Sequence, residues 1–313
     1  TMPVSIIGRL PLFLAVIIAA YALVPSAIAE PFSQGLKTCQ DCHRDEYKTW
    51  ESTKHFTSYR TVHKAREAKK IAVAIGGKKN MKRNKYCVSC HYATQQKSAG
   101  DKPKIKTGPS CESCHGASSD WEAIHFDYGG KNIRREAESG EHKAKRIANS
   151  THAGLIWAAM TYDLAVNCMK CHGLARPGIS GEIFSKMLDA GHPINQSFEI
   201  TLFSQGKMRH WLDKRSPAQL AKLYVAGQAA KLVSATDSAA SSSDGKYKAS
   251  QLKRVSDAKA ALQAFPQAAT FIASPSDASA RDMMEVIGTQ DLSSLVGESM
   301  PCAGPDRENL LQC

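Results

Sequence analysis

The pentapeptide Cys111-Glu-Ser-Cys114-His115 contains the pattern that organises this chain. Its spacing, Cys-x-x-Cys-His, occurs four times among the 313 residues and uses eight of the ten cysteines. The other three copies are Cys39-Gln-Asp-Cys42-His43, Cys87-Val-Ser-Cys90-His91 and Cys168-Met-Lys-Cys171-His172. In chain order they are called the first to fourth motifs, the quoted pentapeptide being the third.

This spacing is typical of covalent haem c attachment. The two thiols add to the vinyl groups of one haem, and the histidine after them becomes an iron ligand. Zinc ribbons do not need a histidine after every cysteine pair, redox-active dithiols require a βαβ context that this chain lacks, and structural disulfides would not repeat one pentapeptide. The sequence therefore predicts four covalently bound haem c groups, with four proximal iron ligands: His43, His91, His115 and His172.

Seven further histidines could supply the sixth iron ligands. Methionine is the other usual sixth ligand, but none of the nine methionines lies in a recognisable ligand setting, so bis-histidine coordination is favoured. His55 and His125 each follow a tryptophan, Trp50 or Trp121, by about one helical turn, so that the indole could pack on a porphyrin. The seven are His55, His63, His125, His142, His152, His192 and His210.

Over about residues 36–200 the chain resembles the tetrahaem cytochrome c-554 family. The resemblance rests on Trp50-Glu-Ser-Thr-Lys-His55, on Gly108-Pro-Ser-Cys111-Glu-Ser-Cys114-His115-Gly116, and on His125, ten residues after His115. It implies that His55 ligates the iron of the third motif and His125 that of the first, with haems packed in close pairs. In that family the second haem lacks a distal protein ligand.

The other sixth ligands are less defined. His152, sixteen residues before the fourth motif on an apolar helical stretch, and His192, in Gly191-His-Pro193, are candidates for the second and fourth haems in either order. His63 is a third candidate. His142 is expected to be solvated, and His210 lies beyond the resemblance.

Residues 1–29 have the composition of an export signal. A single charge, Arg9, precedes the apolar run Leu10–Val24, and Ala27-Ile-Ala29 predicts cleavage before Glu30. An uncleaved membrane anchor is the alternative. Either way the remainder is expected outside the cytoplasm: in the periplasm, or extracellular or membrane-associated.

The expected fold is mostly α-helical, because only 7% of residues are aromatic and no long alternating apolar runs predict a large sheet. Residues 30–200 would form a tetrahaem domain of short helices and irregular chain, and residues 201–313 a helical extension of unknown role. In that extension, Ser216-Pro217 predicts a helix start, with the helix running to Val233. A Ser/Ala-rich linker at 234–243 and helices near 248–264 and 277–287 would follow. Cys302 and Cys313 are expected to pair, an intermolecular bridge or a free thiol being the alternatives.

The formal net charge of +12 arises from 41 Lys and Arg against 29 Asp and Glu. The densest stretch, 64–85, holds nine basic residues against Glu67 alone. Export excludes nucleic acid as a partner, which leaves an acidic redox protein or an anionic membrane surface, unless the stretch is simply a solvated basic loop.

Three functions fit these features. The favoured one is a periplasmic electron carrier, not a catalyst, between a redox enzyme and a downstream acceptor; by resemblance the donor could be a hydroxylamine-oxidising enzyme. The second is a small reductase of nitrite, hydroxylamine or nitric oxide at a five-coordinate haem, although the chain lacks a Cys-x-x-Cys-Lys motif. The third is a subunit of an extracellular electron conduit.

Overall fold

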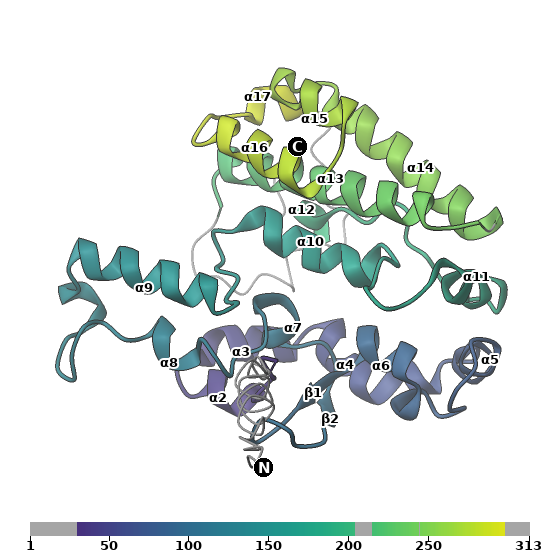
Figure 1. Cartoon of the computed structure of the whole chain (residues 1–313), viewed down its shortest axis with the longest axis horizontal. Coiled ribbons are helices and arrows are strands. Elements are labelled where there is room, and N and C mark those ends of the chain that lie inside the picture. The colour runs from purple at the N-terminus through teal and green to yellow at the C-terminus, as the bar shows by residue number, and fades with distance from the viewer. Residues whose placement is uncertain (1–29, 204–214, 244, 298–313) are drawn as a thin grey trace, which may run out of the picture. The chain divides into compact units, whose positions relative to one another are not determined.

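The computed structural model describes residues 30–203, 215–243 and 245–297. The described chain is mostly helical, as predicted, with one small antiparallel sheet that joins β1 (Ala93–Gln95) to β2 (Lys104–Thr107) (Figure 1). The export-signal prediction, His210 and the Cys302–Cys313 prediction lie outside the described residues.

Short helices make up the part of the chain that carries the motifs. They are α2 (Leu36–Gln40), α3 (Arg44–Glu51), α4 (Lys54–Thr61), η1 (Val62–Lys64), α5 (Ala68–Ala74), η2 (Met81–Arg83), α6 (Lys85–His91), α7 (Cys111–His115), α8 (Glu122–His125), η3 (Arg135–Ala137), α9 (Gly140–His152), α10 (Thr161–His172), α11 (Gly181–Asp189) and α12 (Ile200–Phe203).

Longer helices follow. They are α13 (Pro217–Ala240), α14 (Gly245–Leu262), η5 (Pro266–Ala268), α15 (Ala269–Ala273), α16 (Asp277–Ile287) and α17 (Ser293–Val296). The predicted start of α13 is confirmed: the Ser216 hydroxyl accepts a hydrogen bond from the backbone N–H of Gln219, and the Gln219 side chain accepts one from the Ser216 N–H.

The predicted linker at 234–243 is wrong over most of its length, because α13 continues to Ala240. Ala235, Ser238 and Ala239 are buried, and small side chains let α13 and α14 pack closely there. The composition of this stretch reflects a helix contact and not a flexible connection.

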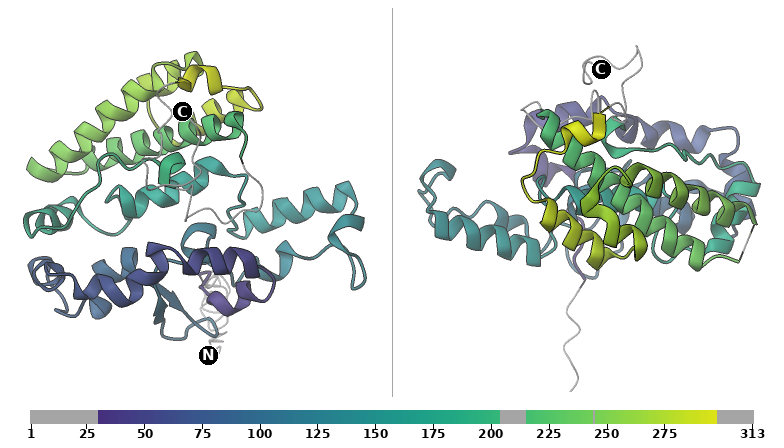
Figure 2. Two further views of the ribbon diagram at one scale, coloured as in Figure 1. Left: turned by 180° about the vertical axis from the view of Figure 1, so that it is seen from behind. Right: turned by 90° about the horizontal axis from the view of Figure 1, so that it is seen from above.

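The helix α13 lies between α10 and α14 (Figures 1 and 2). It contributes Leu223, Val225 and Leu232 to an apolar cluster that also contains Met169 of α10 and Leu262 of α14. Full burial of one such side chain is worth about 1.5–3 kcal/mol. The fourth motif therefore lies on a helix whose apolar face is covered by residues beyond 200, and the described residues from Pro31 onward belong to one compact unit.

A second apolar cluster surrounds the second motif. It joins Ile71 and Ile75 of the α5 region to Cys87 of α6 and to Phe184 and Met187 of α11. The chain around this motif is thus held by helices that flank it in sequence and by α11, about a hundred residues further on.

Candidate functional site

The motifs lie at the ends of helices. His91, His115 and His172 are the last residues of α6, α7 and α10, and His43 caps the start of α3. In the second, third and fourth motifs, helical geometry places the two cysteines one turn apart on the same side, with the histidine next to them; in the first motif Cys42 lies in the turn that follows α2. Each motif thus presents two thiols and an imidazole together, which is the arrangement that haem attachment needs.

Three of the four motif histidines face a histidine from elsewhere in the chain. The ring centroids are 6.4 Å apart for His43 and His125, 5.9 Å for His55 and His172, and 5.9 Å for His91 and His192. A metal bound by two imidazoles lies about 2 Å from each nitrogen, so the ring centroids of its ligands are roughly 6 Å apart. These spacings leave room for one iron between the rings of each pair.

The imidazole nitrogens are also oriented for metal binding. Nδ1 of His115, His125 and His192 lies 2.8, 2.5 and 2.8 Å from the backbone carbonyl oxygens of Ile156, Glu122 and Pro193, respectively. Because a carbonyl only accepts, each Nδ1 donates, and Nε2 keeps the lone pair that binds a metal. The residues present therefore fit the iron of a haem.

Burial keeps these rings neutral. It lowers the pKa of His91 and of His172 to about 4, with the facing histidines His192 and His55 lowering them further. The pKa values of His55, His125 and His192 are also lowered, first by burial. A neutral imidazole is the form that ligates a metal, so these five rings are in the required state at neutral pH.

The structure places His55 opposite His172 of the fourth motif, whereas the resemblance implies that it serves the third motif. A break separates Trp50 from His55, because α3 ends at Glu51 and Thr53 caps the start of α4. Gly108 fixes α4 from the other side, since a Cβ there would collide with the backbone oxygen of His55. The His172 ring also stacks on Phe198 at 4.1 Å.

His192 lies opposite His91 of the second motif. The chain thereby differs from the resemblance, which implies no distal protein ligand at that position. No described contact brings His152 to a motif histidine: it is the last residue of α9 and is exposed, so the structure does not support it as a ligand of the second or fourth haem. No described contact joins His63 to a motif histidine either; its Nδ1 is buried without a partner among the described residues.

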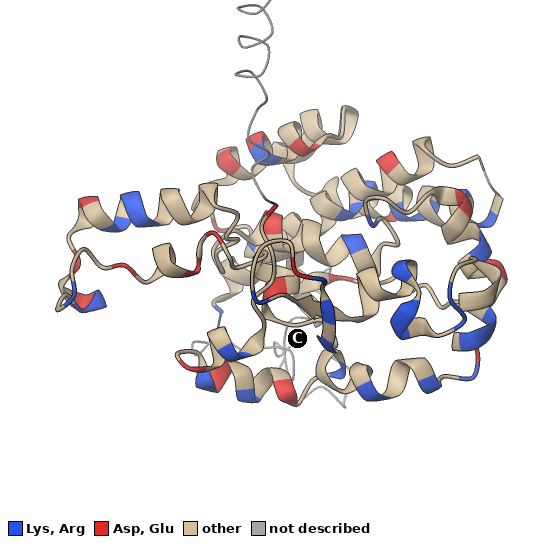
Figure 3. Ribbon diagram, turned by 60° about the horizontal axis from the view of Figure 1, so that its bottom comes forward, with Lys and Arg blue, Asp and Glu red and all other residues tan. Residues whose placement is uncertain are grey.

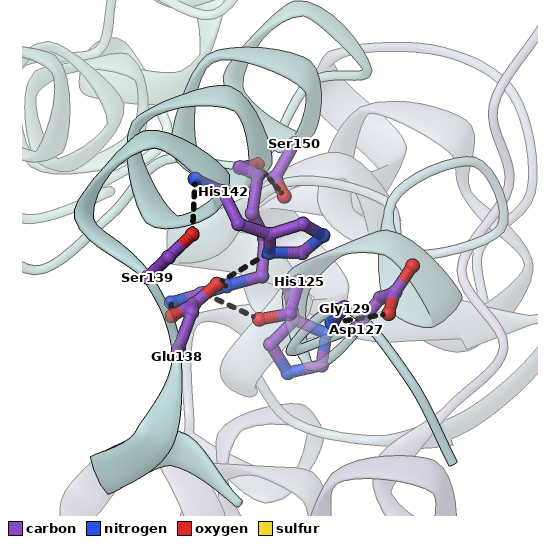
Figure 4. A network of polar contacts seen from close by, with 8 residues as sticks. His125, Asp127, Gly129, Glu138, Ser139, His142 and Ser150 are labelled. Atoms are coloured by element: carbon purple, nitrogen blue, oxygen red, sulfur yellow. Dashed lines mark hydrogen bonds and ion pairs between the residues drawn. The ribbon is translucent and has the colours of Figure 1, made fainter. Parts of the chain in front are cut away.

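The first pair, His43 and His125, is supported by a polar network (Figure 4). Arg146 donates to the backbone oxygen of His125 at 2.8 Å and forms two hydrogen bonds, of 2.7 and 2.6 Å, with the carboxylate of Glu138. Nδ1 of His142 lies 2.8 Å from the same carboxylate, and the His142 side chain is half-buried. His142 thus contacts Glu138, whereas the sequence led us to expect it to be surrounded by solvent. The network ties α8, which ends at His125, to α9.

This network predicts an acid-sensitive contribution to stability. Hydrogen bonds, first from Arg146, lower the pKa of Glu138 from 4.5 to about 2. A carboxylate whose pKa is lowered in the folded state stabilises that state at pH values above its pKa in the unfolded chain. This contribution is lost as pH falls from 4.5 towards 2. We expect the stability difference between the protein and its Glu138→Gln variant, measured by urea unfolding, to be constant above this window and to shrink within it. The exposed residue Glu141 of α9 offers the control Glu141→Gln; if that variant showed the same pH dependence, the network would not be its source.

Cysteines of different motifs are neighbours, which the sequence did not predict. The Cys39 and Cys111 side chains are hydrogen-bonded, which raises the pKa of Cys39. The Cys90 and Cys171 side chains are likewise hydrogen-bonded, which lowers the pKa of Cys90 to about 7. Cys114 and Cys168 lie close enough for the charge of Cys114 to raise the pKa of Cys168, after the larger effect of burial. The motifs therefore adjoin in the order first, third, fourth, second.

Glu112, between the two cysteines of the third motif, has a role that sequence reasoning missed. Its buried carboxylate accepts hydrogen bonds from the backbone N–H groups of Gln34 and Gly35 at 2.9 and 2.8 Å, and from the Ser118 hydroxyl at 2.5 Å. It thus fixes the segment before the first motif against the third. The sequence feature that could have indicated this role is the carboxylate at one of the two unspecified positions of the motif.

Within residues 30–203, 215–243 and 245–297, no three or more His, Cys, Asp or Glu side chains converge to hold a metal ion, as a zinc ribbon would require. No helix in the same ranges combines the length and apolar character needed to cross a membrane.

Comparison with known proteins gives one match. Residues 38–116 match the model of the family described as cytochrome c554 and c-prime. The matched segment contains the first three motifs and His55, so it supports the resemblance from which they were interpreted. No curated protein and no solved structure matches the chain.

Proposed function

We propose that this chain is a c-type cytochrome of electron transport that carries four covalently bound haem c groups; the match of residues 38–116 to the cytochrome c554 and c-prime family supports this. We propose further that it works in the periplasm, where it carries electrons between a redox enzyme and a downstream acceptor. The cysteines of the four motifs would hold the haems, and the motif histidines would ligate their irons.

The facing histidine pairs carry this proposal. An iron with an imidazole on each side has no open position for a substrate, so its chemistry is limited to gaining and losing an electron. Three of the four proposed haems would have this coordination, through His125, His55 and His192. This favours an electron carrier over a nitrogen-oxide or hydroxylamine reductase.

The neighbouring thiols suggest how electrons would pass along the chain. Because the motifs adjoin in the order first, third, fourth, second, the attached haems would form a row with the first and second haems at its ends. The first end is open to solvent, since Cys42 is exposed and the His43 side chain is 55% exposed. Donor and acceptor would then use opposite ends.

Electron paramagnetic resonance of the oxidised protein tests this function. We expect at least three low-spin ferric haems for each chain, and no change in their signals on addition of cyanide. The haem count comes from native mass spectrometry of the same sample. Two or more high-spin irons that bind cyanide would contradict the electron-carrier proposal and favour the reductase.

The basic stretch 64–85 lies beside the second end of the row. It runs directly into α6, and Gly191, next to His192, lies against the side chain of Glu67 within this stretch. Eight of its nine basic residues are exposed, and Lys82 lies over the Tyr59 ring at 3.8 Å. Figure 3 marks the Lys and Arg positions of the described chain in blue. We propose that an acidic redox protein docks here and exchanges electrons with the second haem.

Charge reversal at Lys69, Lys70, Lys78 and Lys79 tests this docking surface. With a reduced acidic flavodoxin as probe, the substitution of all four by Glu is expected to slow bimolecular electron transfer at least about tenfold at low salt and to flatten its salt dependence. The control carries the same change on α14, at Lys246, Lys248, Lys253 and Lys259. Equal slowing in both variants, measured by stopped-flow absorbance, would show that only the net charge matters.

A further inference from the structure

The guanidinium of Arg254, on α14, is buried directly behind the fourth motif. Its side chain is 1% exposed. It donates to the backbone oxygen of Gly173 at 3.1 Å and to the sulfur of Met169 at 3.2 Å, which respectively follow and lie within the motif. The other acceptors are the Gln251 side-chain oxygen at 2.6 Å and the Ser234 hydroxyl at 3.3 Å.

All four acceptors are uncharged, and the ion pairs among the described residues do not include Arg254. Burial lowers its pKa to about 10, so it is protonated at neutral pH. Burying a charge without a compensating charge costs folding free energy. A protein that keeps such a charge therefore gains something else from it. Another buried cation, Lys231, interacts electrostatically with Arg254 and adds positive charge to this region rather than offsetting it.

The same face of α14 holds the backbone that leaves the fourth motif. Tyr247 donates to the Leu174 oxygen at 2.5 Å, and the Gln251 amide donates to the Gly173 oxygen at 3.0 Å. Leu174 has a φ of 50°, in the left-handed region that non-glycine residues rarely adopt. Gly173 must be glycine, because a Cβ there would collide with the Met169 oxygen and the Arg254 guanidinium. Three residues spaced i, i+4 and i+7 on α14 thus fix this turn.

We infer that the buried charge of Arg254 raises the reduction potential of the haem attached at Cys168 and Cys171. Reduction adds one electron to the ferric iron and so removes one positive charge from the site. A fixed cation nearby, in a region of low dielectric constant, favours that change. The inference rests on the proposed function, since it requires a haem at the fourth motif, and it gives the region beyond residue 200 a part in electron transfer.

The test is a potentiometric titration of the tetrahaem protein, with one-electron mediators as reductant and oxidant. In Arg254→Met, an uncharged variant of similar volume, one of the four haems is expected to become about tenfold harder to reduce, which is about 59 mV for a one-electron couple. Arg254→Gln removes the charge but keeps a donor to Gly173, and serves if the methionine variant does not fold. Arg254→Lys is expected to leave the potential close to that of the unaltered protein, because lysine keeps the positive charge.

Two controls separate electrostatics from packing. Lys253→Met removes an exposed charge from the same helical turn and is expected to leave all four potentials unchanged. Gln251→Leu removes a hydrogen bond to Gly173 while Arg254 stays, and the potentials should again be kept. A potential shift in Gln251→Leu equal to that in Arg254→Met would overturn the inference in favour of a purely structural role.

The affected haem is identified in a Cys168→Ala, Cys171→Ala background, which lacks the fourth attachment site. There Arg254→Met should shift none of the three remaining potentials; a shift that persists would overturn the assignment to the fourth haem. Native mass spectrometry separates the two proposals. Fewer than four haems in the unaltered protein would contradict the proposed function itself, whereas four haems with unchanged potentials in Arg254→Met and Arg254→Gln would overturn only the role of Arg254.

Discussion

Replacing His55 by Ala is expected to convert one low-spin haem to the high-spin state while all four haems stay covalently attached. The His55 ring lies 5.9 Å from that of His172, so its loss would leave the fourth iron with a single imidazole. Electron paramagnetic resonance would detect the new high-spin signal, and native mass spectrometry would confirm that the haem count is unchanged. Loss of a sixth ligand changes the spin state of one iron completely, which makes this the largest spectroscopic effect we predict.

The same variant distinguishes the two possible partners of His55. In the Cys168→Ala, Cys171→Ala background, His55→Ala should add no high-spin iron, because the haem that it serves is missing. If a high-spin iron still appeared there, His55 would ligate a different haem, as the family resemblance implied for the third motif. His152→Ala is the matched control, since His152 is exposed and faces no motif histidine, and its spectrum should not change.

Substitution of Leu232 by Asp should destabilise the whole protein. Leu232 of α13 is fully buried in the apolar cluster shared by α10, α13 and α14. Loss of a buried leucine costs about 2–5 kcal/mol, and burial of an unpaired carboxylate adds to it, so the total takes up much of the 5–15 kcal/mol typical of a folded protein. Urea unfolding followed by circular dichroism measures the loss.

Leu252→Asp provides the comparison on the neighbouring helix α14. The Leu252 side chain is 51% exposed, so the change is expected to cost less than about 0.5 kcal/mol. If both substitutions had the same small effect, the burial of Leu232 in this cluster would be contradicted. A large effect of Leu232→Asp alone, accompanied by weaker retention of the fourth haem, would show that α13 supports α10.

The sequence predicted those features that depend on neighbours along the chain. The mostly helical fold is confirmed, and the cap at Ser216-Pro217 and the helix at 277–287 were predicted correctly. The placement of His125 beside His43 also agrees with the resemblance.

The remaining partners depend on contacts between distant segments, which spacing does not encode. The break between α3 and α4 redirects His55 towards α10, and only α11 and the turn after it bring His192 to α6. His152 lies on a helix, as expected, but that helix ends at it and leaves it in solvent. The Ser- and Ala-rich end of α13 was mistaken for a linker, because small residues serve both close helix packing and flexible chain.

The paired thiols constrain how this protein can mature. In a chain that folded before its cofactors were attached, the Cys39 side chain would be hydrogen-bonded to Cys111, and that of Cys90 to Cys171. Under the oxidising conditions proposed for its compartment, such neighbours would be open to oxidation into cross-links between different motifs. If the chain carries four haems, as proposed, we therefore expect all four attachment reactions to be complete before the polypeptide closes around them.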